Sequence, residues 1–187
     1  MKKITILFAL ILCMALAGCS QSAKQASPAD ESAAPASTEG EQTAALYIGT
    51  KAGGFTKYPM IYEGELTPEM LIQGISDLTG WNLTLAEDVT KDKDGMGVCL
   101  SNESSLFTGP PDPQKEEFYV YGAEELAEII LDSIQETLQK SVVSESDDSD
   151  LPDIRYYTEG MQPLELPNLG LSWPIDQPYQ WAEAQSE

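Results

Sequence analysis

The chain has 187 residues, of which 31 are Asp or Glu and 10 are Lys or Arg, so its formal net charge is −21 at pH 7. This charge argues against a nucleic-acid partner, because binding to phosphates requires cationic side chains that neutralise them. The chain contains no histidine, which excludes Ser–His and Cys–His catalysis and every zinc site with a histidine ligand.

The N-terminus has the pattern of a bacterial lipoprotein signal peptide over residues 1–18. Two lysines precede a mainly apolar run, and the run ends in the motif Leu16-Ala17-Gly18-Cys19. The run is shorter than the about 20 apolar residues of a membrane span, and its small-residue end is typical of a cleaved signal. Leu16, Ala17 and Gly18 are therefore predicted to direct the signal peptidase, and Cys19 to carry the lipid. An ordinary signal peptide or a short anchor helix is the alternative.

Lipidation at Cys19 would fix the location of the protein. Two acyl chains hold a protein stably on a bilayer, whereas one chain holds it only marginally. The expected location is the extracytoplasmic face of the cell membrane. Residues 20–43 contain no aromatic residue and no Leu, Ile or Val, so they cannot bury enough apolar surface to order themselves. With Cys19 they are predicted to form a flexible tether, which as a coil spans about 27 Å.

Three cysteines are present, and each has a different expected fate. Cys13 leaves with the signal peptide and Cys19 is lipidated, so Cys99 alone remains. The mature domain can therefore form no internal disulfide, although an exported protein could keep one. Cys99 lies in an apolar, strand-like run, which predicts a buried and inert thiol.

The first half of the predicted domain contains two strands and a helix. Residues 45–49 are rich in β-formers, Gly53-Gly54 marks a turn, and residues 57–64 alternate Tyr, Met and Tyr onto one face. The proline within this second strand suggests an edge. Thr67-Pro68-Glu69 begins a helix that ends at Gly80, because Thr caps, Pro suits the first turn and Gly accepts a left-handed backbone.

The second half contains further strands around the longest helix. Strands are predicted over residues 83–89 and 96–101, with a turn at 91–95, and a loop is predicted over 102–114. A helix over residues 123–142 has an aliphatic residue at every fourth position. Strands at 153–157 and 163–166 follow. The order predicts an α+β fold: a single compact domain with a mixed sheet of four to six strands and two main helices packed on one face.

Five segments between residues 44 and 176 share the pattern of a known family. They are Leu46-Tyr47-Ile48, the first helix from Thr67 to Gly74, the inner strand Gly97-Val98-Cys99-Leu100-Ser101, the long helix around Ser133 and Thr137, and the closing strand from Asp153 to Leu164. Together they resemble the GerMN domain of sporulation and spore-germination proteins.

The resemblance implies a compact fold related to ring-building motifs of secretion and sporulation complexes. It also implies an envelope lipoprotein, with a role in sporulation or germination, that works by protein–protein contact without catalysis. The chain departs from the family in having Glu159-Gly160 where an Asp-Gly turn is usual, and in having room for one domain rather than two in tandem.

The C-terminal residues contain the best candidates for a partner-binding surface. Trp173, Tyr179 and Trp181 are interleaved with prolines, the last two within a tail predicted over residues 177–187. Aromatic side chains often anchor protein interfaces. The more ordinary interpretation is that this segment folds back and packs against the domain.

Acidic clusters suggest calcium but do not establish it. Asp88, Asp92 and Asp94 precede Gly95, yet the loop lacks the bidentate Glu of an EF-hand, and a hairpin turn is the simpler interpretation. A second cluster could bind calcium weakly or form a solvated loop; it comprises Glu145, Asp147, Asp148, Asp150 and Asp153. No metal and no cofactor is predicted.

These observations favour a non-enzymatic, membrane-anchored interaction module. It would present a sheet edge or the aromatic tail to an exported or membrane protein, and an oligomer is compatible with this role. The alternative is a ligand-binding or wall-polymer-modifying protein that uses acidic residues in a cleft, with calcium as a potential ligand. A cleft lined by two or more carboxylates with raised pKa would favour the alternative.

Overall fold

The structure is a computed structural model that describes residues 40–93, 95–110, 114–142 and 151–180. The predicted signal peptide, Cys19 and the tether up to residue 39 lie outside these ranges. So do Asp94, the acidic residues from 145 to 150, and Trp181. Among the residues described, no helix has the length and apolar character needed to cross a membrane.

The described chain begins with an antiparallel hairpin of β1 (Glu41–Gly49) and β2 (Phe55–Glu63). The predicted Gly53-Gly54 turn is confirmed, and both glycines have positive φ. β1 starts before residue 44, so the predicted tether is too long at its end. Gln42 explains this difference, because it pairs with Tyr62, accepts a hydrogen bond from the Tyr62 hydroxyl and donates one to the Gly64 carbonyl.

The two main helices are where the sequence predicts them. α1 (Pro68–Thr79) is capped by Thr67, whose hydroxyl accepts the Met70 N–H at 3.3 Å, and it ends at Gly80 with φ 82°. α3 (Ala123–Val142) buries its aliphatic residues completely at Leu126, Ile130, Ile134 and Leu138. Each such side chain contributes about 1.5–3 kcal/mol when buried, which makes α3 the main core helix.

The remaining strands form one five-stranded sheet in chain order. They are β3 (Thr90–Asp92), β4 (Gly95–Cys99), β5 (Ile154–Thr158), β6 (Gln162–Leu166) and β7 (Leu171–Trp173). β4 and β5 are parallel and the other neighbours are antiparallel. The predicted α+β class and mixed sheet are confirmed. The first two strands, however, make a separate sheet of their own.

Three local predictions are wrong. Residues 83–89 are not a strand, because only Leu85 forms a bridge, to Leu100, and the Asn82 side chain instead holds a turn by accepting the Thr84 N–H. The predicted loop over 102–114 contains the short helix α2 (Ser105–Thr108), and a 3-10 turn, η1 (Glu116–Phe118), follows. The predicted turn over residues 91–95 is too long, because Lys91 and Asp92 belong to β3 and pair with Met96 and Gly95.

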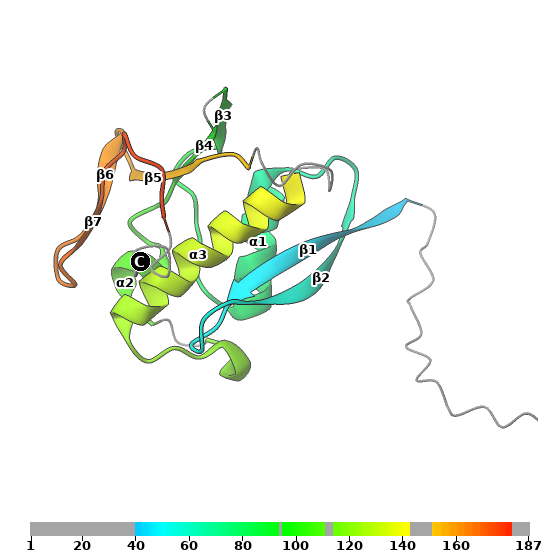
Figure 1. The fold of residues 1–187 in the computed structure, drawn as a ribbon. Coiled ribbons are helices and arrows are strands. Elements are labelled where there is room, and N and C mark those ends of the chain that lie inside the picture. Colours follow the sequence, from blue (N-terminus) through cyan, green and yellow to red (C-terminus); the bar gives the residue numbers. More distant parts are fainter. Residues whose placement is uncertain (1–39, 94, 111–113, 143–150, 181–187) are drawn as a thin grey trace, which may run out of the picture. The chain divides into compact units, whose positions relative to one another are not determined.

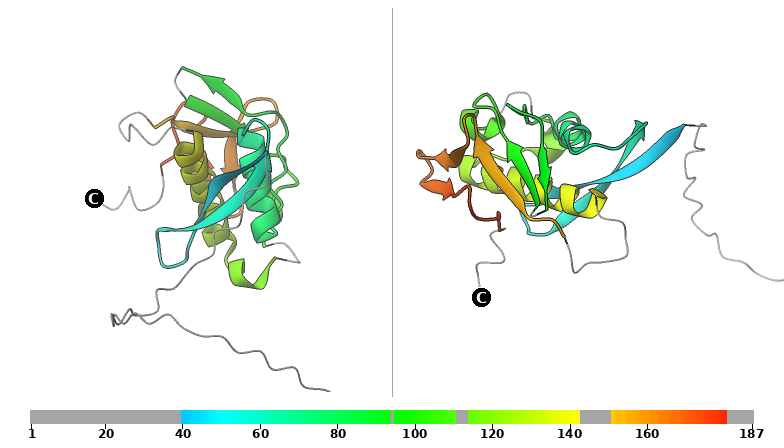
Figure 2. Two further views of the ribbon diagram at one scale, coloured as in Figure 1. Left: turned by 90° about the vertical axis from the view of Figure 1, so that its right-hand side faces the viewer. Right: turned by 90° about the horizontal axis from the view of Figure 1, so that it is seen from above.

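α1 and α3 lie side by side, with the five-stranded sheet across one side of the pair and the hairpin against another (Figures 1 and 2). Residues from both sheets and both helices form one buried cluster that includes Leu46, Leu71, Val98, Ile130 and Tyr156. The hairpin and the C-terminal strands therefore lie on different parts of the surface, and each borders its own concavity.

Candidate functional site

One edge of the hairpin is covered by α3 through hydroxyl side chains. The Thr137 hydroxyl accepts the Tyr47 N–H at 2.9 Å and donates to the Tyr47 carbonyl at 3.2 Å. Ser133 accepts the Gly49 N–H at 2.9 Å, and Ser141 donates to the Ala45 carbonyl at 2.8 Å. A helix thus supplies the hydrogen bonds that a neighbouring strand would otherwise make.

The spacing of these hydroxyls explains why they reach alternate strand residues. Four helical residues advance about 6 Å along the axis, and two strand residues advance about 6.8 Å. Hydroxyls at every fourth position of α3 therefore meet every second residue of β1. The sequence contains this signal as Ser133, Thr137 and Ser141, but its meaning depends on which strand lies beside the helix.

The opposite edge of the hairpin is open. Because Tyr47 directs its backbone groups to α3, its cross-strand partner Lys57 directs its own away from β1. The same geometry holds for Pro59, Ile61 and Glu63. Within the described part of the chain, the outward backbone groups of Lys57, Ile61 and Glu63 have no hydrogen-bond partner. Pro59 has no N–H to offer, as expected of an edge strand.

A groove of about 770 Å³ separates this open edge from α1. Met60 and Tyr62 of β2 line it on one side, and Met70 and Leu78 of α1 on the other. At Gly74, α1 approaches the Met60 side chain so closely that a Cβ at this position would collide with the Met60 sulfur. The other lining residues are Leu46, Pro59, Ile61, Glu69, Gln73, Asp77 and Lys115.

The charged rim of the groove is mainly acidic. Burial alone would raise the pKa of Glu69, but hydrogen bonds from its own backbone, from Thr67 and from the Val89 N–H at 2.9 Å outweigh this effect and hold the pKa below 4.5. Glu69 is therefore ionised at neutral pH. Asp77, eight residues after Glu69 on α1, is exposed. The Lys115 Nζ donates a hydrogen bond to the backbone carbonyl of Asp77 at 2.7 Å.

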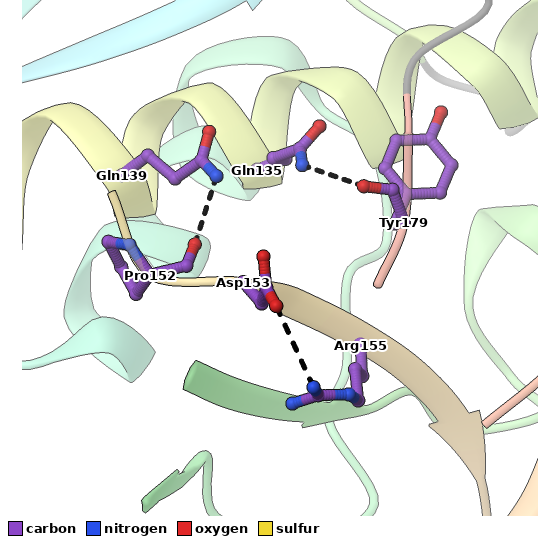
Figure 3. A network of polar contacts seen from close by, with 6 residues as sticks. All are labelled: Gln135, Gln139, Pro152, Asp153, Arg155 and Tyr179. Carbon is purple, nitrogen blue, oxygen red and sulfur yellow. Dashed lines mark hydrogen bonds and ion pairs between the residues drawn. The ribbon is translucent and has the colours of Figure 1, made fainter. Parts of the chain in front are cut away.

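The second concavity lies where the C-terminal segment returns to α3. Gln135 donates to the Tyr179 carbonyl at 3.0 Å, and Gln139 donates to the Pro152 carbonyl at 2.9 Å, so one helix face holds both segments (Figure 3). The Tyr179 N–H also donates to the Ile154 carbonyl, and the Tyr179 hydroxyl donates to Asp132 at 2.6 Å. Asp153 and Arg155 form an ion pair at 3.7 Å beside this contact (Figure 3).

Of the three aromatic residues predicted to bind a partner, Trp173 and Tyr179 lie next to each other. Tyr179 is buried and packs edge-on against Tyr156, with ring centroids 5.1 Å apart, and Trp173 lies 6.1 Å from Tyr179. Trp173 is half-buried, and Trp181 lies outside the described residues. Tyr179 therefore packs against the domain, as the more ordinary interpretation of the C-terminal segment predicts. Trp173, in contrast, borders an open space.

That space is a cavity of about 530 Å³. Glu128 of α3 forms one wall, and the β6–β7 turn and the C-terminal segment form the others; the lining comprises Glu128, Tyr156, Gly170, Leu171, Ser172, Trp173, Pro174, Gln177, Pro178, Tyr179 and Gln180. No lysine or arginine of the described chain is among these residues.

The cavity has a negative electrostatic environment. Burial raises the pKa of Glu128, and the neighbouring charges of Glu124 and Glu125 raise it further. Burial and the adjacent Asp132 also raise the pKa of Tyr179 far above its ordinary range. A ligand-binding or wall-polymer-modifying protein is expected to have a cleft lined by two or more carboxylates with raised pKa. Among the described residues that line this cavity, Glu128 is the one carboxylate.

The other candidates from the sequence do not form a site in the described residues. No group of three or more Cys, Asp and Glu side chains is placed to hold a metal ion there. Asp92 is part of the β3–β4 hairpin, where it pairs with Gly95. Cys99 is completely buried, and burial together with Glu87 and Glu159 raises its pKa to about 11.

Comparisons of the chain with family models, with curated proteins and with solved structures find no match. The similarity to the GerMN domain therefore remains a prediction from the sequence, and the two concavities carry the functional argument.

Proposed function

We propose that this protein is a lipid-anchored, non-enzymatic module of the cell envelope that binds an extended segment of another exported or membrane protein at the open edge of β2. The observation that carries the proposal is the contrast between the two edges of the hairpin. α3 covers the β1 edge with three hydroxyl side chains, whereas the β2 edge faces an apolar groove.

An added strand would use both features of this edge. Its backbone would pair with the outward N–H and C=O groups of Lys57, Ile61 and Glu63, and every second side chain would enter the groove against Met60, Met70 and Leu78. Strand addition of this kind takes affinity from main-chain hydrogen bonds and specificity from the pockets for alternate side chains.

The charge of the groove restricts the partner. Glu69, Asp77 and one lysine, Lys115, border it, and the chain carries a net charge of −21. The net negative charge attracts a basic segment and repels an acidic one. The expected partner segment has apolar residues at alternate positions and lysine or arginine near its ends. A second copy of this chain is disfavoured, because two such acidic chains repel each other.

The predicted anchor makes this arrangement useful at the membrane. The lipid on Cys19 would keep the domain within reach of other envelope proteins, and the groove would select among them. A role in sporulation or germination, as the GerMN resemblance implies, is a narrower form of the same proposal.

A proline at position 61 tests the proposal without breaking the hairpin. Ile61 does not bond to β1, so Ile61→Pro removes an outward N–H donor and no existing ladder bond. Met60 before it is already extended, as a residue before proline must be. Ile61→Thr is the matched control, because it keeps the N–H and a β-branched side chain.

The assay is crosslinking of the anchored full chain in intact cells, followed by pull-down and identification of the captured proteins. We expect one dominant exported or membrane protein with the wild-type chain and with Ile61→Thr, and its loss with Ile61→Pro. Equal recovery of that protein with Ile61→Pro would refute strand addition at this edge, as would recovery of the chain alone in every case.

A further inference from the structure

We propose that the cavity between α3 and the C-terminal segment binds a small organic cation, an alkylammonium or quaternary ammonium compound, between the Glu128 carboxylate and the aromatic side chains of Trp173 and Tyr179. This site is separate from the β2 groove, shares no lining residue with it, and would function whether or not the groove binds a strand.

The walls of the cavity supply the two groups that recognise an ammonium ion. Glu128 provides a carboxylate on α3, and Trp173 provides a half-buried indole from β7. Aromatic faces attract cations through the ring quadrupole, with Trp the strongest, and quaternary ammonium ligands are the usual guests of such sites. Tyr156 and Tyr179 add two further rings, which pack edge to face against each other, and the Tyr179 ring also lies beside that of Trp173.

The charge distribution selects against an anion. Glu124 and Glu125 act electrostatically on Glu128, and Asp132 acts on both Tyr156 and Tyr179. No described lysine or arginine lines the cavity to offset them. A negatively charged guest would meet only like charge, while a cation would relieve the repulsion among these carboxylates.

The shape of the cavity is held by contacts that do not involve the proposed guest. Tyr179 is fixed by hydrogen bonds to Asp132, Gln135 and Ile154. The β6–β7 turn is fixed by backbone bonds from Leu169 to Leu166 and from Gly170 to Pro167. The walls are thus formed in advance, which lowers the cost of ordering them when a ligand binds.

The test compares choline with its neutral carbon isostere, 3,3-dimethylbutan-1-ol, by isothermal titration calorimetry. The protein is the full chain in maltoside micelles, and the two probes have nearly the same shape. We expect choline to bind at least about tenfold more tightly than the neutral compound. Phosphocholine should bind more weakly than choline because of its added negative charge. This comparison distinguishes a free ammonium ligand from a lipid headgroup, which carries a phosphate.

Two variants assign the binding to this cavity. Glu128→Gln and Trp173→Leu should each weaken choline binding about tenfold, whereas Glu63→Gln, an equal charge change at an exposed residue of β2 that does not line the cavity, should alter it less than about twofold. Circular dichroism confirms that each variant is folded. Equal affinity for choline and its isostere, no binding of either, or unchanged binding in both cavity variants would overturn the proposal.

Discussion

The hydroxyl of Thr137 makes both backbone hydrogen bonds of Tyr47, accepting its N–H at 2.9 Å and donating to its carbonyl at 3.2 Å. In a continuous sheet these two bonds would come from another strand. Because α3 provides them, β1 cannot accept a further strand, and the hairpin retains a single open edge. The asymmetry that supports the proposed function therefore depends on this pair.

Replacing Thr137 by valine should destabilise the fold. Valine has the same shape but no hydroxyl, so it leaves both backbone groups of Tyr47 without partners beside a side chain that is completely buried. An unsatisfied buried polar group costs about 1–3 kcal/mol. Urea denaturation should show this loss for Thr137→Val and much less for Thr137→Ser. Equal stability of Thr137→Val and the wild type would contradict the edge-sealing role.

The charge on Glu128 should lower stability at neutral pH. Its folded-state pKa lies above 4.5 because of burial and the charges of Glu124 and Glu125, so folding favours the protonated form. Ionisation above the folded pKa therefore costs stability, and this cost disappears as the pH falls through the folded pKa to below 4.5.

Glu128→Gln removes that cost, so the variant should be more stable than the wild type at pH 7 and equally stable near pH 4. Chemical denaturation at both values measures the difference. The same change at Glu165, exposed on β6, gives the reference for losing one negative charge. A Glu128→Gln variant that is less stable than wild type at pH 7 would show that the carboxylate makes a favourable contact.

Cys99 should be unreactive in the folded protein. Its thiol is completely buried, and its pKa is raised to about 11, so little thiolate forms at neutral pH. Iodoacetamide at pH 8, followed by peptide mass mapping, should leave Cys99 unlabelled in the native chain and label it fully in urea. Rapid labelling of the native chain would show that β4 opens.

Cys19→Ala should abolish the membrane anchor. The thiol of Cys19 is the predicted site of diacylglyceryl transfer, and lipid anchoring requires it. Cell fractionation should find the variant released into the medium or retained with its signal peptide uncleaved. A Cys19→Ala protein that is processed and remains in the membrane fraction would exclude the lipoprotein assignment.

The sequence predicts the helices well because their signals are local. Thr67, Pro68 and Gly80 mark the ends of α1, and the fourfold aliphatic repeat marks α3. Strand signals were weaker where side chains compete with the backbone. Asn82 converts the expected strand at 83–89 into a turn, and Gln42 extends β1 into residues without apolar character.

The candidate sites were less predictable because both depend on tertiary neighbours. Ser133, Thr137 and Ser141 are ordinary polar residues until β1 lies beside them. Glu128 is one acid among 31 acidic residues in the sequence, and only the return of Tyr179 to α3 brings it to the same cavity as Trp173. Residues that are far apart in the chain thus form both concavities.

Site-specific photo-crosslinking at the β2 edge tests the central claim most directly. A benzophenone amino acid replaces Ile61 in one strain and Met161 in another, since both side chains are 59% exposed but only Ile61 borders the groove. The account predicts that irradiation of intact cells joins the Ile61 variant to one exported or membrane protein and the Met161 variant to none. Crosslinks from Met161 alone, or from neither position, would contradict strand binding at β2.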